Sequence, residues 1–162
     1  MENNKKFYIN GQWVDPISPK ALEVINPANE EAITEISMGS EEDLNKAVSA
    51  AKNAFLSFSQ TSREERLALF EKIIEVYKKR MPDLAKVITS EMGAPVNLAN
   101  AAQAPAGLGH ISKAYKTLKD YKFEFEMNTT IIRKEPVGVC GLITPWNWPI
   151  NQIACKVGPA LA

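Results

Sequence analysis

The strongest constraint on the fold lies near the C-terminal end of this sequence, in the segment VGVCGLITPWNWPINQ, residues 137–152. Its first eight residues, 137–144, are apolar and rich in β-branched side chains, which is typical of a strand covered on both faces in a parallel sheet. Thr144 and Trp148 each precede a proline, so both are restricted to extended backbone. Because Pro149 suits the first position of a helix, the segment predicts a buried strand, a rigid loop and a helix in succession.

Asn147 lies in this loop between two tryptophans, just before the predicted helix. In open α/β sheets, ligands bind beyond the carboxyl ends of the strands and beside the N-termini of helices. A neutral amide in such a place can stabilise an oxyanion as it develops. Asparagine is also a common helix cap. The loop by itself therefore leaves two roles open for Asn147: an oxyanion donor, or a cap beside tryptophans that fill the core.

Upstream of this segment, short strands are expected on both sides of a helical block. The stretch FYINGQWV, residues 7–14, predicts a hairpin, because Asn-Gly favours a type I′ turn. Further strands are expected at ALEVINP, residues 21–27, and at EAITEISMG, residues 31–39. The alternation in KFEFEM, residues 122–127, predicts a half-buried strand, and TTIIRKEP, residues 129–136, continues in extended conformation.

Between these strands the apolar residues recur at helical spacing. Ser40 with Asp43 resembles a capping box and predicts the start of a helix. One face of that helix is expected to be apolar, formed by Leu44, Ala47, Val48, Ala51, Phe55 and Phe58. A second helix is expected from about Ser62, with inward side chains at Leu67, Phe70, Ile73, Ile74 and Tyr77.

Prolines and glycines predict where the later helices begin, break and end. Pro82 suits the first turn of a third helix, which would carry Leu84, Val87, Ile88 and Met92 on its apolar side. Gly93 and Pro95 are expected to end it. A longer helical pattern then runs toward Tyr121, with a kink or a break expected near Pro105.

Composition narrows the classes of function. Lysine plus arginine and aspartate plus glutamate are equal at 19 each, which gives no reason to expect nucleic acid or an acidic membrane surface as a partner. No apolar run has transmembrane length, and the N-terminal stretch lacks the apolar core of a signal peptide. A single histidine argues against a His-rich metal site, and two distant cysteines fit a reducing compartment. The chain is therefore expected to be globular and cytoplasmic, with no metal site.

We interpret three residues with reactive side chains as structural rather than catalytic. His110 is expected to be a structural or surface histidine. Cys140 falls within the predicted buried strand and Cys155 on the following helix, and both are expected to be small packed side chains, since free cysteine is usually buried.

The segments PVGVCGLITPWNWP, residues 136–149, and KVGPALA, residues 156–162, closely resemble the aldehyde dehydrogenase superfamily. Its pattern is a P-x-G-V strand, then P-W-N-[FW]-P, then K-x-x-P-A-L-A. The upstream stretches INGQWV, VINPANEEAI, AVSAAKNAF and EMGAP are also similar to the family's N-terminal region. The resemblance covers nearly the whole chain.

The resemblance implies an α/β fold, the N-terminal part of the aldehyde dehydrogenase fold, within residues 1–162. Its parts would be strands over 7–38, a helical block over 40–121, linking or oligomerisation strands over 123–136, and the start of a Rossmann-like NAD(P)-binding domain over 137–162. The implied activity is the oxidation of a small-molecule aldehyde to a carboxylic acid with NAD or NADP, through a thiohemiacetal. The full-length form is implied to be a homodimer or homotetramer.

The resemblance also assigns roles residue by residue. Asn147 matches the asparagine whose amide, with a backbone N–H of the nucleophile, binds the oxyanion. The loop implied to lie along the cofactor consists of Ile143, Thr144, Pro145, Trp146 and Asn147. The wall of the substrate tunnel is implied to include Trp148, with Gln152 and Cys155 on the same helical face at about i+4 and i+7. Lys156 matches a family lysine that we interpret as structural.

Members of the family are much longer and continue with a Gly-rich cofactor turn, a glutamate base and a nucleophilic cysteine, none of which is present here. We therefore expect an N-terminal fragment that is inactive alone. Two alternatives stay open: a truncated, non-catalytic binding or assembly module from the same family, and a relative that forms acyl-CoA or acyl phosphate on the same fold.

Overall fold

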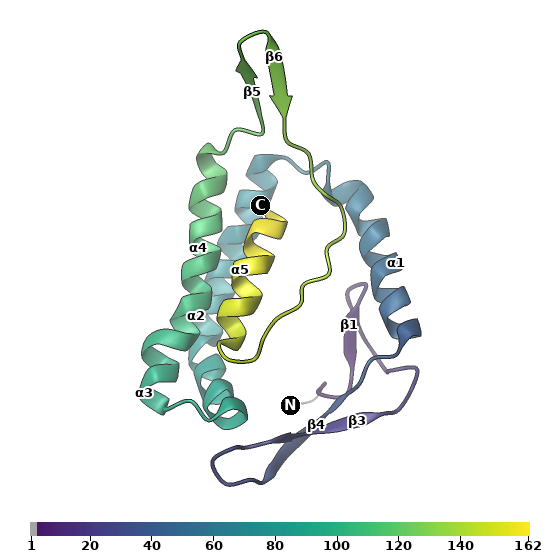
Figure 1. Cartoon of the computed structure of the whole chain (residues 1–162), viewed down its shortest axis with the longest axis vertical. Coiled ribbons are helices and arrows are strands. Elements are labelled where there is room, and N and C mark those ends of the chain that lie inside the picture. The colour runs from purple at the N-terminus through teal and green to yellow at the C-terminus, as the bar shows by residue number, and fades with distance from the viewer. Residues whose placement is uncertain (1–2) are drawn as a thin grey trace.

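The computed structural model describes residues 3–162 and consists of a helical bundle with three separate hairpins around it (Figure 1). The strands are β1 (Phe7–Ile9), β2 (Gln12–Val14), β3 (Ala21–Ile25), β4 (Ala32–Ser37), β5 (Glu124–Met127) and β6 (Thr130–Arg133). The helices are α1 (Glu41–Phe58), α2 (Arg63–Met92), α3 (Val96–Leu98), the π-helical segment η1 (Ala99–Gln103), α4 (Ala104–Asp120) and α5 (Pro149–Leu161).

The strands pair in sequence order as antiparallel two-stranded sheets, β1 with β2, β3 with β4 and β5 with β6. Asn10 and Gly11 have φ angles of 52° and 76°, as a type I′ turn requires, so the predicted hairpin at residues 7–14 is confirmed. The strands expected at 21–27 and 31–39 are present as well. The strand expected at 122–127 is present as β5, but the chain then turns at Asn128 and returns as β6 instead of continuing in the same direction. In Figure 1 the β5–β6 hairpin projects beyond one end of the bundle, and β3 and β4 lie across the other end.

The capping box that predicts the start of α1 is confirmed. The hydroxyl of Ser40 accepts a hydrogen bond from the backbone N–H of Asp43 (3.2 Å), and the Asp43 carboxylate accepts one from the N–H of Ser40 (3.0 Å). Asp43 also accepts from the N–H of Ile17 (3.1 Å), which ties the loop before β3 to the helix. These bonds to the ionised form, chiefly that from Ser40, hold the pKa of Asp43 below its ordinary value.

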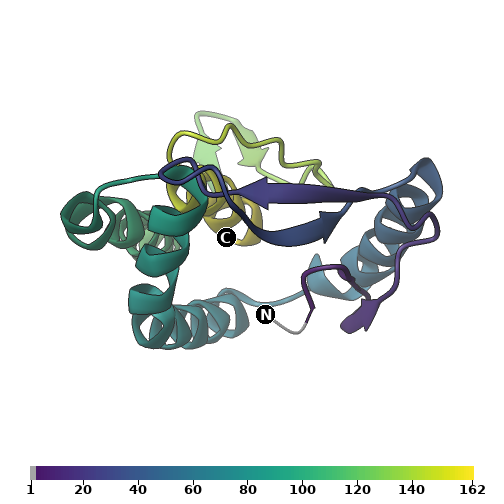
Figure 2. The same ribbon diagram turned by 90° about the horizontal axis from the view of Figure 1, so that it is seen from below.

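Only part of the expected apolar face of α1 is covered. Ala47, Val48, Phe55 and Phe58 are half-buried, but Leu44 is 62 % exposed and Ala51 is exposed too. Figure 2 shows the reason, because α1 stands apart from the bundle of α2, α4 and α5. The continuous helix places all six residues on one face, as predicted, but this face is only partly buried.

One helix replaces the second and third helices expected from the sequence. α2 begins after Ser62, whose capping box with Glu65 is complete, and runs through Pro82 to Gly93, which adopts the left-handed conformation. The predicted start at Pro82 is wrong. Proline removes one backbone donor from the helix. The buried side chains on either side of Pro82 nevertheless pack into two adjoining core clusters, Tyr77 in one and Ala85 and Ile88 in the other, and this packing keeps the helix intact.

The core of the molecule lies between α2, α4 and α5. One cluster of buried side chains consists of Phe70, Tyr77, Ile111, Leu118 and Ala154, and a second of Ala85, Ile88, Ala94, Ala99 and Ala104. Ile150 packs against both clusters. The kink or break expected near Pro105 takes the form of a change of helix type: the backbone stays helical, but the π-helical segment gives way to α4 at Ala104, one residue before Pro105.

The buried strand predicted over residues 137–143 does not form, and this prediction is wrong for the structure described here. The segment has no strand conformation, and Val137 and Ile143 are 94 % and 89 % exposed. Cys140 is exposed rather than packed. A parallel strand is stabilised by ladder hydrogen bonds to neighbouring strands. Within residues 3–162, each of the six strands pairs only within its own hairpin, so the segment has no partner.

Candidate functional site

The loop that carries Asn147 leads into α5 as the sequence predicts. α5 begins at Pro149, and Trp148 is its N-cap residue, with φ −139° and ψ 71°. The first helical hydrogen bond runs from the N–H of Gln152 to the carbonyl of Trp148 (3.0 Å). No side chain among the described residues caps this helix, and Asn147 is exposed. Asn147 therefore does not act as a helix cap here, and its amide stands in solvent beside the positive end of the helix dipole.

Small residues at the helix interface fix the position of α5. A Cβ atom added to Gly158 would lie 3.2 Å from the Cβ of Ala114, a tight contact, so glycine favours the close approach of α5 to α4. Gly107 of α4 plays the same part for Tyr77 and Ile150. The Tyr77 hydroxyl donates a hydrogen bond to the carbonyl of Ala104 (2.7 Å), and burial raises the pKa of Tyr77 to about 12.

An apolar groove of about 580 Å³ lies between the C-terminal half of α2 and the first turns of α5. Its lining consists of Pro27, Leu84, Val87, Ile88, Glu91, Met92, Trp146, Pro149, Ile150 and Ile153. Trp146 remains 79 % exposed at this groove. Loss of solvent around Glu91 raises the pKa of its carboxyl above the ordinary value.

The groove therefore brings Trp146, one of the residues expected to lie along a cofactor, next to residues that the sequence analysis did not assign to a site. Two of these residues lie in stretches whose resemblance to the family could have indicated a site. Pro27 belongs to the family-like stretch VINPANEEAI, and Glu91 to EMGAP. Neither Asn147 nor Trp148 contributes to the lining.

The other expected site residues divide into an exposed loop and a half-buried helix face. Ile143, Thr144 and Pro145 are exposed, as are Trp146 and Asn147. Trp148, Gln152 and Cys155 are half-buried and follow one another at i, i+4 and i+7 around the start of α5, which puts them on one side of the helix.

Lys156 fixes part of this helix face. Its ammonium group donates to both the backbone carbonyl and the side-chain oxygen of Gln152, at 3.2 Å each. The thiol of Cys155 is 3.4 Å from the same backbone carbonyl. The carboxamide of Gln152 is thus oriented by a charged donor on the next turn, in agreement with the structural interpretation of Lys156.

His110 is a surface residue, as expected. It lies on α4, and its Nε2 atom is 2.7 Å from Oδ1 of Asn151, on α5. The bond joins the two helices beside the Trp148, Gln152 and Cys155 face.

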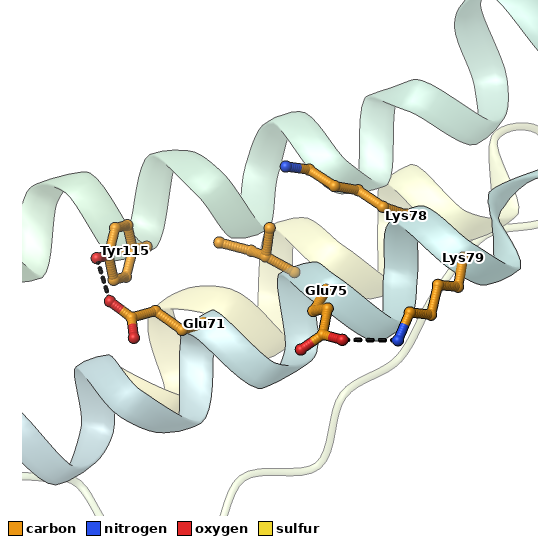
Figure 3. A pocket seen from close by; sticks show the side chains of 6 residues that line it. Glu71, Glu75, Lys78, Lys79 and Tyr115 are labelled. Atoms are coloured by element: carbon orange, nitrogen blue, oxygen red, sulfur yellow. Dashed lines mark hydrogen bonds and ion pairs between the residues drawn. The ribbon is translucent and has the colours of Figure 1, made fainter.

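A second, open hollow of about 420 Å³ lies between α2 and α4 (Figure 3). Four of its polar side chains bond to one another. The hydroxyl of Tyr115 donates to Glu71 (2.7 Å), and Lys79 pairs with Glu75 (2.6 Å). This hollow is formed by other residues than the Asn147 loop.

Over residues 3–162, no group of three or more His, Cys, Asp and Glu side chains is arranged to hold a metal ion. In the same range, no helix is both long and apolar enough to cross a membrane.

Comparisons with known proteins agree with the geometry. The model of the aldehyde dehydrogenase family matches residues 13–162. A curated relative, 3-succinoylsemialdehyde-pyridine dehydrogenase of Pseudomonas sp, is 53 % identical over the whole chain, which covers 34 % of that protein. A crystal structure of aldehyde dehydrogenase from Bartonella henselae superposes with a TM-score of 0.95 at 48 % identity, over 98 % of this chain and 34 % of that one.

A mutant of aldehyde dehydrogenase C from Pseudomonas syringae, crystallised with NAD+ and octanal, superposes with a TM-score of 0.96 at 43 % identity, over 99 % of this chain and 33 % of that one. The chain belongs to the aldehyde dehydrogenase family, and its mixed helix and strand structure matches the N-terminal part of that fold. It spans about a third of the length of the curated relatives and solved structures that it matches.

Proposed function

We propose that this sequence forms the N-terminal part of an NAD(P)-dependent aldehyde dehydrogenase, in which Asn147 donates a hydrogen bond to the oxyanion of the reacting aldehyde. The observation that carries this proposal is the exposure of Asn147 at an uncapped helix N-terminus. Its amide is exposed at the N-terminus of a 13-residue helix whose first turn has no side-chain cap. A neutral donor beside the positive end of a helix can stabilise a developing oxyanion without a charge of its own.

The chemistry assigns a separate task to each part of the loop. The amide of Asn147 and the positive end of α5 stabilise negative charge on the carbonyl oxygen as the carbon becomes tetrahedral. That interaction is stronger in the transition state than with the bound aldehyde, so it serves turnover more than binding. Trp148, Gln152 and Cys155 form part of the wall that orients the aldehyde.

The residues around the loop fit a dinucleotide cofactor. Ile143 and Trp146 present exposed apolar surface (89 % and 79 %), which suits a planar ring and its sugar. Thr144 and Pro145 complete the segment that would hold the cofactor beside Asn147. A bound nicotinamide ring would supply the acceptor for the hydride that leaves the thiohemiacetal carbon. The NAD+ in the related Pseudomonas syringae structure supports this assignment.

Cys140 and Cys155 are not proposed as nucleophiles, and the nucleophile and the general base are proposed to lie in parts of the full-length protein outside this sequence. Residues 1–162 alone are thus proposed to be inactive. We further propose a cytoplasmic homodimer or homotetramer, in which strands over 7–38 and 123–136 contribute to subunit contacts. Exposed apolar side chains on these strands, such as Leu22 and Ile131, support that assignment.

The experiment uses a full-length protein that carries this sequence as its N-terminal part. NAD(P)H formation with octanal is measured at saturating substrate, and the variant Asn147→Ala is expected to lower kcat by about 10²–10³-fold with little change in cofactor affinity. Asn45→Ala is the matched control, because Asn45 is an exposed asparagine on α1. A kcat for Asn147→Ala equal to that of the control would refute the oxyanion role.

A further inference from the structure

The hydrogen bond between His110 and Asn151 joins side chains of α4 and α5 across 2.7 Å, and neither the oxyanion donor nor the expected substrate wall accounts for it. His110 is exposed and Asn151 is half-buried, so the pair stands at the surface rather than in the core. A polar contact whose only task is to hold two helices together gains little at an exposed position.

The position of Asn151 on α5 determines which surface of the helix the pair lies next to. The buried residues Ala154 and Gly158 mark the side of α5 that packs on α4. Asn151 lies three residues after Trp148 and four before Cys155, and residues at these spacings are neighbours on a helix surface. Asn151 therefore borders the Trp148–Cys155 face on the side toward α4, and His110 extends that face onto the second helix.

The remaining hydrogen-bonding capacity of the pair does not depend on how the protons are placed. If Nε2 of His110 donates to Oδ1 of Asn151, the Asn151 NH₂ group remains a donor and Nδ1 of His110 an acceptor. With the opposite tautomer and a flipped amide, Nδ1–H is the open donor and Oδ1 the open acceptor. In either arrangement the pair presents one donor and one acceptor next to the proposed substrate wall.

We propose that His110 and Asn151 together form a specificity element that selects aldehydes bearing a hydrogen-bonding group, such as a keto oxygen, some bonds away from the aldehyde carbon. The inference rests on the proposed function, because it assigns the pair to the same substrate site. An aldehyde with such a group gains a hydrogen bond to the pair, whereas a plain alkyl aldehyde leaves its donor and acceptor without a substrate partner. The net gain from this hydrogen bond favours the aldehyde with the polar group over the analogue that lacks it.

The test compares two substrates of equal chain length, 4-oxopentanal and pentanal, with the full-length protein. The ratio of their kcat/KM values is measured for the wild type, for His110→Phe and for Asn151→Leu. Loss of one hydrogen bond to a neutral group is expected to lower this ratio by about 3- to 10-fold in each variant, chiefly through the oxo substrate. The double variant is expected to lose no more than the larger single loss, since the two residues act as a unit.

Tyr115→Phe is the matched control, because it removes another 2.7 Å bond of α4, to Glu71 on α2, and faces the hollow in Figure 3. The control is expected to leave the substrate ratio unchanged. His110→Gln keeps a side chain that can bond Asn151 and is expected to retain most of the ratio, which keeps the test decisive if His110→Phe is unstable.

Equal losses for both substrates in the His110 and Asn151 variants would overturn the proposal and reduce the pair to a link between helices. A wild type that oxidises both aldehydes with no preference for the oxo compound would overturn it as well, while the proposed function would stand. A wild type that oxidises neither aldehyde would refute the proposed function and this inference together.

Discussion

Replacing Gly107 with alanine is expected to disturb the packing that positions α5 and the Asn147 loop. A Cβ atom at this position would lie 2.2 Å from the hydroxyl oxygen of Tyr77, 2.9 Å from its Cζ atom and 3.1 Å from Cγ1 of Ile150. Tyr77 is only 9 % exposed, so its ring has little room to withdraw. The shift needed to relieve the contact breaks its 2.7 Å hydrogen bond to the carbonyl of Ala104.

Three contributions determine the expected change in the free energy of unfolding, two of them destabilising and one stabilising. A buried tyrosine hydroxyl left without its partner costs about 1–3 kcal/mol. An extra methyl group in a well-packed core costs about 1–3 kcal/mol. Alanine gains about 1 kcal/mol over glycine inside a helix. The net loss in the free energy of unfolding for Gly107→Ala is therefore about 1–5 kcal/mol.

The assay is thermal unfolding of the full-length protein with Gly109→Ala as the matched control. Gly109 lies two residues further along α4, and an added Cβ meets no atom within 4 Å, so the control should be neutral or more stable by up to about 1 kcal/mol. Adding Tyr77→Phe, which removes the closest clashing atom, should make the double variant lose less than the sum of the single losses. A Gly107→Ala protein that melts at or above the Gly109→Ala protein would refute the packing described here.

Two further predictions concern the ends of the helices. Gly93→Ala should cost at least about 1–2 kcal/mol, because the residue has a φ of 74° and its new Cβ would lie 2.8 Å from Cγ of Pro27; an unchanged melting temperature would contradict this. Asp43 is ionised in the folded protein with a lowered pKa, so its bonds to Ser40 and Ile17 stabilise the fold above the unfolded value near 3.8. That stability is lost as pH falls through the folded pKa, and Asp43→Asn should flatten the acid limb of a plot of melting temperature against pH. An acid limb equally steep in the variant would exclude Asp43 as its source.

Elements specified by neighbouring residues were predictable from the sequence. The Asn10-Gly11 turn needs only two residues that tolerate positive φ, and both adopt it. The capping box at Ser40 is formed within four residues of sequence, and Gly93 ends α2 through its own backbone conformation. The start of α5 belongs to this class too, since Pro149 is favoured at a first helical position whatever surrounds it.

Features that depend on distant parts of the chain were not predictable in the same way. Pro82 is a local helix breaker, but the core packing of Tyr77 and Ile88 on either side of it keeps α2 continuous. The apolar run at 137–143 has the composition of a buried strand, yet a strand also needs a partner, and the described strands offer none. The groove beside Trp146 combines residues from three separate segments, which no periodicity could have brought together.

The candidate site was predictable in part for the same reason. The loop and helix that carry Asn147 are local, so their placement followed from the sequence. The bond between His110 and Asn151 spans 41 residues and depends on how α4 packs against α5. A lone histidine on a helix gives no sign of such a partner.

The proposed role of Asn147 is that of an oxyanion donor and not of a helix cap, and the variant Asn147→Asp separates these two roles. Aspartate caps a helix as well as asparagine does, but its carboxylate repels an oxyanion. In the full-length protein, we expect Asn147→Asp to keep the wild-type melting temperature while kcat for aldehyde oxidation falls by at least about 10²-fold. An Asn147→Asp enzyme with wild-type kcat would contradict the claim and reduce Asn147 to a structural residue.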